Sequence, residues 1–175
     1  IIRMKNSENC CVYTKAQITW LVVLRLFIGW HFMYEGLVKI MNPKWTSMAY
    51  LLDSKGPASS FFIGLTQDPA TMNLVNLCNE WGLFLVGLGL LTGCLSKLSA
   101  IGGITFLGIY YLSHPSFIGA GYIMPFEGTY LWIDKNLVEL AALVVLLVFP
   151  TSKIIGIDRL LVKAMPKSIL KLKLI

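Results

Sequence analysis

The sequence is poor in charged residues and in histidine. Only 14% of its 175 residues are charged, only two are histidine, and 56% are hydrophobic. Together with a mean hydropathy of +0.70, this composition excludes an ordinary soluble domain and suits one polytopic membrane bundle. The net charge is +6, but no run of Lys and Arg carries interleaved aromatics. We therefore expect basic residues that flank membrane spans in a lipid bilayer and no nucleic-acid partner.

The four cysteines form no recognisable motif. None of them is spaced as CxxC, which argues against a dithiol redox site and a zinc knuckle, so we expect no metal. We interpret the adjacent Cys10 and Cys11 as reduced thiols, with lipidation or redox activity left open. No cleavable signal peptide is predicted, because the first apolar run is too long and lacks a small-residue cleavage site.

Long apolar stretches dominate the rest of the chain. They predict four membrane-spanning helices, at about residues 17–41, 73–93, 98–112 and 134–149. The connection 43–72 is broken by Gly and Pro but rich in aromatics, which favours a partly helical cap at the membrane surface. The fold class is therefore an all-α integral membrane protein. We expect a single four-transmembrane-helix domain over residues 1–166, with long outer loops.

The chain after the fourth span alternates basic and apolar residues. From Lys153 this period is typical of an amphipathic helix on an anionic membrane face, and a solvated basic tail over 167–175 stays open. Ten Lys and Arg residues lie in the N-terminal segment, the turn at 95–97 and the tail, against four in the two long connections and their borders. This bias predicts that both termini are cytoplasmic, in a bacterial inner membrane.

The first span carries ionisable residues along one side. These are Arg25, His31, Glu35 and Lys39. At 100° per residue they fall within about 120° of the helix circumference. Because an ionisable group costs several kcal/mol in lipid, we expect this side to face the bundle interior.

Two further carboxyls are expected at the depth of Glu35. Glu80 in the second span and Glu139 in the fourth both lie toward the long connections. We predict that these carboxyls converge with His31 and Lys39 on one pocket, where at least one exchanges a proton near neutral pH.

Such a cluster suits proton-coupled chemistry on a quinone head group. The predicted catalytic residues are Glu35, His31, Glu80 and Glu139, and the predicted quinone-binding residues are Arg25, Lys39, Asn76, Trp81, Asn136, His114 and Trp132. A haem shared by the two histidines is not expected, because their depths differ by roughly 10–15 Å. The alternative, that the polar residues only fix helix register, stays open.

Four segments of the chain resemble the DoxX/DoxD family. They are RLFIGWHFMYEGLVKI, GPASSFF, EGTYLWIDKNLVELAAL and GIDRLL, within about Trp20 to Leu161. The chain is similar to the DoxD-type membrane subunit of thiosulfate:quinone oxidoreductase. The family-like positions are Arg25, Gly29, Glu35, Gly36, Lys39, Gly128, Asn136 and Glu139.

This resemblance implies a membrane subunit that passes electrons from a second, dehydrogenase-type or thiosulfate-oxidising subunit to menaquinone or ubiquinone. The alternative is a non-catalytic membrane anchor or assembly factor for a partner protein. Assembly into a homo-oligomer also stays open.

Overall fold

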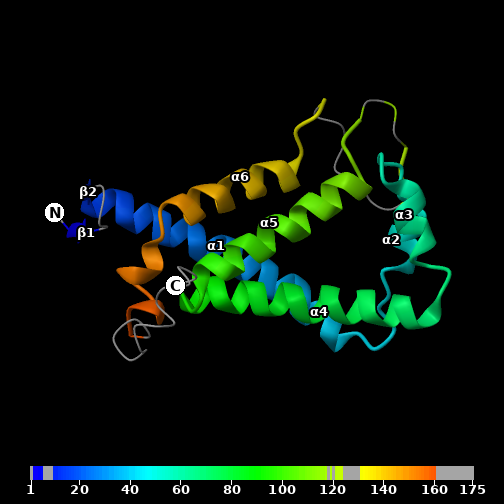
Figure 1. The fold of residues 1–175 in the computed structure, drawn as a ribbon, viewed down its shortest axis with the longest axis horizontal. Helices are drawn as coiled ribbons and strands as arrows, with labels where there is room; N and C mark the ends of the chain where they lie inside the picture. Colours follow the sequence, from blue (N-terminus) through cyan, green and yellow to red (C-terminus); the bar gives the residue numbers. More distant parts are fainter. Residues whose placement is uncertain (1, 6–9, 118, 120, 124–130, 161–175) are drawn as a thin grey trace.

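Four long helices run roughly along the long axis of the molecule. The computed structural model describes residues 2–5, 10–117, 119, 121–123 and 131–160. The long helices are α1 (Lys15–Met41), α4 (Pro69–Thr92), α5 (Ser96–Ser113) and α6 (Lys135–Val148) (Figure 1). As helices they agree closely with the four segments that the sequence predicts, apart from the start of α4. The tail helix predicted from Lys153 does not begin there: a short 3-10 helix, η1 (Thr151–Lys153), is followed by turns and bends up to Ile157. The rest of this tail beyond residue 160, and Gly128, lie outside the described residues.

The ends of the long helices are set by local capping signals. Thr14 and Gln17 form a reciprocal capping box at the start of α1. At the start of α4, the Asp68 side chain accepts a hydrogen bond from the Thr71 backbone N–H at 2.8 Å. Proline is favoured at a first helical position, so α4 begins at Pro69. The predicted start at residue 73 was therefore wrong, because Pro69 initiates the helix instead of breaking it.

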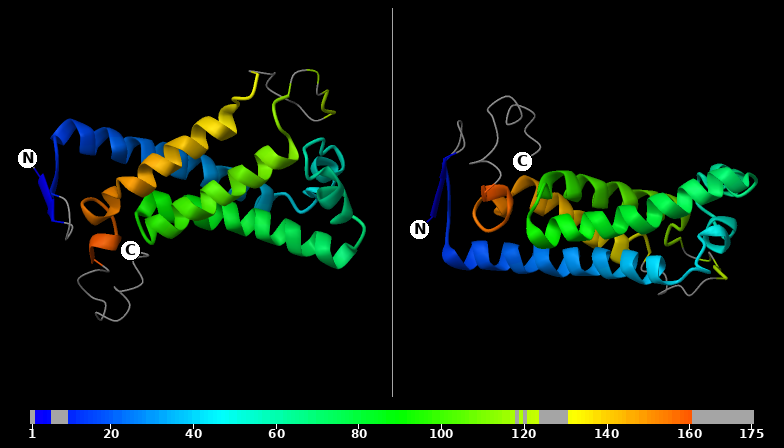
Figure 2. Two further views of the ribbon diagram at one scale, coloured as in Figure 1. Left: turned by 45° about the horizontal axis from the view of Figure 1, so that its top comes forward. Right: turned by 90° about the horizontal axis from the view of Figure 1, so that it is seen from below.

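The helices form two pairs that diverge toward one end. Contacts are most extensive between α1 and α4 and between α5 and α6, while α1 and α6 touch only sparsely. The pairs are close at the end that carries residues 150–160 and separate toward the end that carries α2 (Met48–Leu52) and α3 (Ser59–Gly64) (Figures 1 and 2). We call the second end the cap end. The apolar core fills the narrow part, through Ile28, Phe32, Leu83, Val86, Leu90, Ala100, Leu107, Leu143 and Leu146.

Glycines let α1 and α4 approach backbone to backbone. A Cβ added at Gly87 would collide with the Met33 backbone, and one at Gly36 would collide with the Phe84 backbone. Small residues of this kind are the usual means of close packing between membrane helices. The α1/α4 pair is therefore the tightest contact in the bundle, and it fixes the ionisable side of α1 relative to α4.

The cap confirms the predicted partly helical connection. Its helices α2 and α3 bury Leu51 and Phe62 against Met72 at the start of α4. The chain returns to the end of α5 through Ser54, whose hydroxyl donates to the Ser113 carbonyl at 2.9 Å. The cap thus bridges the opening between the diverging helix pairs.

A short hairpin precedes the helices and was not predicted. Strands β1 (Ile2–Lys5) and β2 (Cys10–Tyr13) pair antiparallel, with Ile2 opposite Tyr13. Strands of four residues carry little periodicity, which is why the pattern escaped notice. A two-stranded hairpin is only marginally stable by itself, and it does not alter the helical architecture that positions the polar residues.

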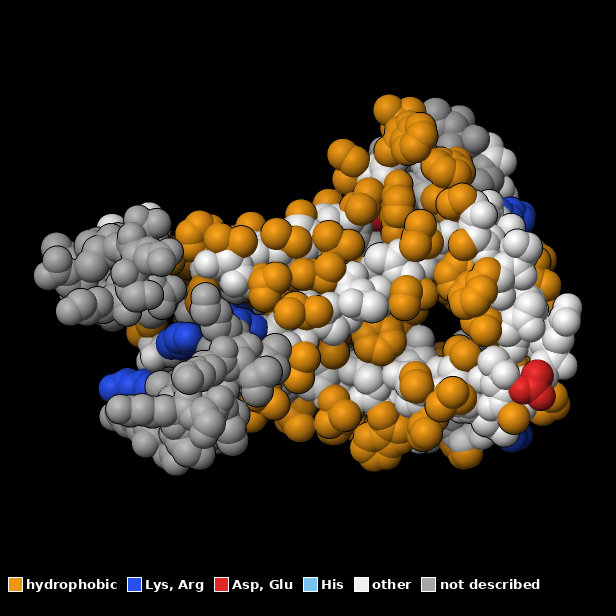
Figure 3. Space-filling model, viewed as in Figure 1, with side chains coloured by type: hydrophobic (Ala, Val, Ile, Leu, Met, Phe, Trp, Pro, Cys, Tyr) orange, Lys and Arg blue, Asp and Glu red, His pale blue; other side chains and the backbone are white. Residues whose placement is uncertain are grey.

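The outer surface of the helices is strongly apolar. Figure 3 shows hydrophobic side chains spread over α4, α5 and α6, with Lys and Arg gathered toward the ends of the molecule. On α1 the exposed residues Trp20, Phe27, Tyr34 and Met41 follow at intervals of seven, so they share one face. By length and composition, α1 and α4 qualify as membrane spans. This is the surface of a membrane protein.

Candidate functional site

A histidine–glutamate pair joins α1 to α6 inside the apolar part of the molecule. His31 Nδ1 lies 2.8 Å from one Glu139 carboxylate oxygen and 3.0 Å from the other. The His31 side chain is 50% exposed, whereas that of Glu139 is 14% exposed. The pair can therefore hold a proton between two partners while one of them still faces outward.

A second set of polar residues links three helices nearer the cap end. Lys39 Nζ lies 3.6 Å from a Glu35 carboxylate oxygen and donates to Asn79 Oδ1 on α4 at 3.2 Å. Asn79 Nδ2 in turn donates to the Tyr110 hydroxyl on α5 at 2.7 Å. Lys39 is mostly buried, with 16% of its side chain exposed, while Glu35 is half exposed. A buried ammonium thus directs a hydrogen-bond chain across the bundle.

Glu35 lies within electrostatic range of both sets. Glu35 acts on both His31 and Tyr110, and Glu80 acts on Lys39. We call His31, Glu35, Lys39, Asn79, Tyr110 and Glu139 the polar network. Figure 3 shows an opening in the surface between α4 and α5 toward the cap end, where the helix pairs diverge. The polar network thus contains four of the predicted residues, namely His31, Glu35, Lys39 and Glu139. Glu80 is not a member and acts on the network only through the charge of Lys39.

Several other predicted residues lie outside the network. Asn76 accepts from the backbone N–H and the hydroxyl of Ser47, so it holds the start of α2. Asn136 donates to Asp134, the N-cap of α6, at 3.2 Å. Trp81 and Trp132 are exposed, at 47% and 61%. The contacts of the two asparagines are typical of structural links, and the exposure of the two tryptophans is typical of aromatics at a membrane interface. A role of these four residues in binding stays a prediction.

His114 belongs to a separate aromatic cluster in the cap. Its ring stacks on Tyr50 with centroids 3.9 Å apart and lies 4.8 Å from the Tyr122 ring. Burial lowers the pKa of His114. The Asp53 carboxylate raises it by less than burial lowers it, and the positive charge of Lys55 lowers it further. Burial also raises the pKa of Tyr50. His114 is thus held as a neutral ring, and it is not brought to His31.

Arg25 lies at the opposite end of the bundle. Its guanidinium donates to the Thr151 hydroxyl at 3.1 Å and to the Ile155 carbonyl at 2.7 Å. Nearby, the fully buried Asp158 accepts from the Leu95 and Ser96 backbone N–H groups at 2.6 and 3.2 Å. We call Arg25, Ser96, Thr151, Ser152, Ile155 and Asp158 the clamp. It ties the segment after α6 to α1 and to the start of α5.

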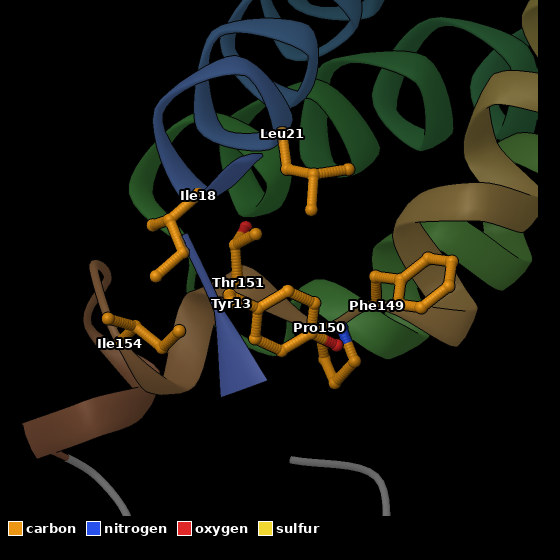
Figure 4. Close-up of a pocket in the computed structure, with 7 residues that line it drawn as sticks. All are labelled: Tyr13, Ile18, Leu21, Phe149, Pro150, Thr151 and Ile154. Carbon is orange, nitrogen blue, oxygen red and sulfur yellow. The ribbon is translucent and has the colours of Figure 1, made fainter. Parts of the chain in front are cut away.

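A small pocket opens beside the clamp and not at the polar network. It is lined by Tyr13, Ile18, Leu21, Phe149, Pro150, Thr151 and Ile154 (Figure 4). The Tyr13 and Phe149 rings meet edge to face, with centroids 6.2 Å apart. Tyr13 is the one ionisable side chain in its lining, and the other lining residues are apolar apart from Thr151.

Sequence reasoning missed two members of the network and every member of the clamp except Arg25. Asn79 is one of three asparagines near the start of α4, and Tyr110 stands beside Tyr111 on α5. Only the helix crossings show that Asn79 and Tyr110 meet. Asp158 lies in the GIDRLL segment, which signalled a shared motif without a role. Among the described residues, no group of three or more His, Cys, Asp or Glu could hold a metal ion.

Comparison with known proteins identifies one relationship. A protein-family model described as DoxX matches residues 20–115, which is more than half of the chain. The match covers α1, the cap, α4 and α5, and so includes every network residue except Glu139. No curated protein and no solved structure matches the chain.

Proposed function

The chain belongs to the DoxX family of membrane proteins, and from that premise we propose that it is the membrane subunit of a quinone-linked oxidoreductase. Electrons reach the quinone pool from a partner subunit that oxidises the substrate. The observation that carries this proposal is the His31–Glu139 pair, 2.8 Å apart, in which His31 is half exposed within an apolar surface. Ionisable groups are kept in such surroundings mainly where they serve a ligand or a proton.

In this proposal all four long helices cross the bilayer. At about 1.5 Å per residue, α1 and α4 exceed the ~30 Å hydrocarbon thickness, whereas α5 and α6 fall somewhat short of it. Exposed apolar residues that flank α6, including Trp132, Ile133 and Phe149, extend its apolar length. The Lys and Arg bias places the clamp and both termini on the cytoplasmic side, and the cap outside.

The polar network supplies what quinone reduction requires of a protein. A quinone takes up two electrons and two protons, and its ring oxygens need hydrogen-bonding partners in lipid. Glu35 and His31 are exposed enough to reach a ring that enters between the diverging helix pairs, while Glu139 holds the imidazole in place. General acid–base groups in contact with the reacting oxygen typically contribute 10²–10⁴-fold to the rate.

The test begins with gentle purification of the protein from its native membrane. Extracted quinone and co-purifying chains are identified together, because the proposal requires both. Turnover and thermal stability are then measured in parallel for the Glu35→Gln, Glu80→Gln and Glu139→Gln variants. We expect Glu35→Gln and Glu139→Gln to lose at least tenfold in turnover with little change in melting temperature, and Glu80→Gln to lose less.

The competing function is that of a membrane anchor or assembly factor. It predicts the opposite division: unchanged turnover of the complex and lowered stability at all three positions. A purified protein with a partner chain but no quinone would favour it as well.

A further inference from the structure

The orientation of one hydroxyl hydrogen follows from the hydrogen-bond chain that crosses the bundle. An ammonium group can only donate hydrogen bonds. The Asn79 amide must therefore turn its oxygen toward Lys39, at 3.2 Å. Its NH₂ group then faces the Tyr110 oxygen, 2.7 Å away. Tyr110 is consequently an acceptor from Asn79, and its own hydrogen has to point elsewhere.

No partner for that hydrogen is found in the part of the chain that the structure describes. The hydroxyl oxygen makes only the bond from Asn79 there, although Tyr110 lies mostly buried on α5. Glu35 is close enough to act on Tyr110 electrostatically. The region thus offers a hydroxyl donor within electrostatic range of a carboxylate, near the cap end of α5.

The charge at the start of the chain makes Tyr110 a stronger donor. Hydrogen bonds in series polarise one another, and the effect is larger away from water. The Lys39 ammonium pulls electron density from the Asn79 carbonyl, and the amide N–H pulls it from the Tyr110 oxygen. A neutral phenol held in this way suits an uncharged carbonyl oxygen better than an anion, because the carboxylate of Glu35 nearby repels negative charge.

From this geometry we infer that Tyr110 donates the hydrogen bond that recognises one ring carbonyl of the quinone. The inference rests on the proposed function and names a contact within that site. Lys39 and Asn79 are positioning residues here, because they act on the ligand only through the Tyr110 hydroxyl. Glu35 is half exposed and is left for the proton.

Two substitutions separate this role from simple packing. Tyr110→Phe removes the donor and keeps the ring. Asn79→Asp keeps the Tyr110 hydroxyl but replaces the amide donor by a carboxylate, which would accept the hydroxyl hydrogen and take it from the ligand. Tyr111→Phe is the matched control, because the Tyr111 hydroxyl donates to the Trp132 carbonyl at 2.8 Å, outside the network.

The experiment uses the full-length protein in detergent with decylubiquinone and, separately, a short-chain menaquinone as probes. Binding is measured by titration, and the carbonyl stretches of the isotope-labelled quinone are recorded by infrared difference spectroscopy. The wild type should lower the frequency of one of the two carbonyls. Tyr110→Phe and Asn79→Asp should both abolish that shift and raise the Kd about tenfold. A tenfold change corresponds to ~1.4 kcal/mol, which is what one hydrogen bond typically contributes. Tyr111→Phe should change neither.

The outcomes distinguish this inference from the function on which it rests. If the wild type binds neither quinone, both are wrong. If the wild type binds and the carbonyl shift survives in Asn79→Asp, the assignment of Tyr110 is wrong while the quinone function stands. Should Tyr110→Phe fail to fold, Asn79→Asp decides alone, because it retains every ring of the wild type.

Discussion

The two ends of the bundle treat their polar residues in opposite ways. At the clamp, Arg25 is 4% exposed and Asp158 fully buried. Arg25 donates a short hydrogen bond to the Ile155 carbonyl, and Asp158 accepts one from the Leu95 N–H. In the polar network, His31 and Glu35 are each about half exposed, although they lie among apolar side chains. Both ends contain ionisable groups on the same helix, α1.

This difference distinguishes polar residues that stabilise the fold from polar residues that remain able to bind a ligand. Most buried polar atoms of the clamp are hydrogen-bonded within the protein and hold the segments together, although Arg25 Nε has no partner among the described residues. A half-exposed ionisable group in an apolar environment contributes little to stability and keeps an open side that a ligand can reach. The comparison predicts large losses of stability at the clamp and small ones in the network, and the following experiments test that order.

The largest effect is expected from Asp158→Ala. The substitution leaves the Leu95 and Ser96 backbone N–H groups without their acceptor, whereas the Ser96 hydroxyl keeps its hydrogen bond with Ser152. At 1–3 kcal/mol for each unsatisfied group, partly offset by relaxation, we expect unfolding to become easier by about 3 kcal/mol. Thermal unfolding in detergent measures it. The control, Asp68→Ala, removes an exposed cap, and an equal loss there would contradict the prediction.

A somewhat smaller loss is expected where α1 and α4 touch. In Gly87→Ala the new methyl group meets the Met33 backbone, which cannot move aside without shifting α1. Overpacking of this kind typically costs about 1–3 kcal/mol. Gly108→Ala is the matched control, because nothing lies within 4 Å of an added Cβ there. It should be neutral or slightly stabilising, since alanine favours the helix. Equal melting temperatures for the two variants would show that the close approach is not limiting.

The third experiment compares the two cations of α1 directly. Arg25→Met removes buried hydrogen bonds to Thr151 and Ile155, and should cost about 2–3 kcal/mol. Lys39→Met leaves a Glu35 that solvent or lipid headgroups can still reach, and should cost about 1 kcal/mol. Lys39→Met should nevertheless reduce quinone binding more than Arg25→Met. The reverse order in stability would remove the distinction between the two ends.

The smallest effect is the pH dependence contributed by His114. Because burial lowers its pKa below the ordinary value of 6.5, the unfolded chain takes up the proton first. Stability is therefore complete above pH 6.5 and declines as the pH falls through 6.5 toward the lowered value. His114→Phe keeps a ring beside Tyr50 and removes the titrating group, so its melting temperature should decline less below pH 6.5. Parallel curves for the two proteins would contradict this prediction.

The helical layout was within reach of the sequence, apart from one helix start and the hairpin. The spans are long apolar runs, and the cap is marked by Gly56 and Pro57 between aromatic residues. The spacing of four residues on one helix also predicted that Glu35 and Lys39 would lie near one another. The sequence did not predict that Lys39 donates to Asn79, because the crossing of α1 and α4 decides that Asn79 meets Lys39 while Asn76 contacts Ser47.

What the sequence by itself determined is therefore the set of helices, their apolar surface and the ionisable side of α1, since these depend on periodicity and on the cost of charge in lipid. Only the tertiary structure decided which polar groups meet. His31 and Glu139 are 108 positions apart along the chain. Arg25 and Thr151, which meet in the clamp, are 126 positions apart. Such contacts depend on helix rotation and crossing. These are set by backbone packing at residues such as Gly36 and Gly87, and they leave no periodic trace in the sequence.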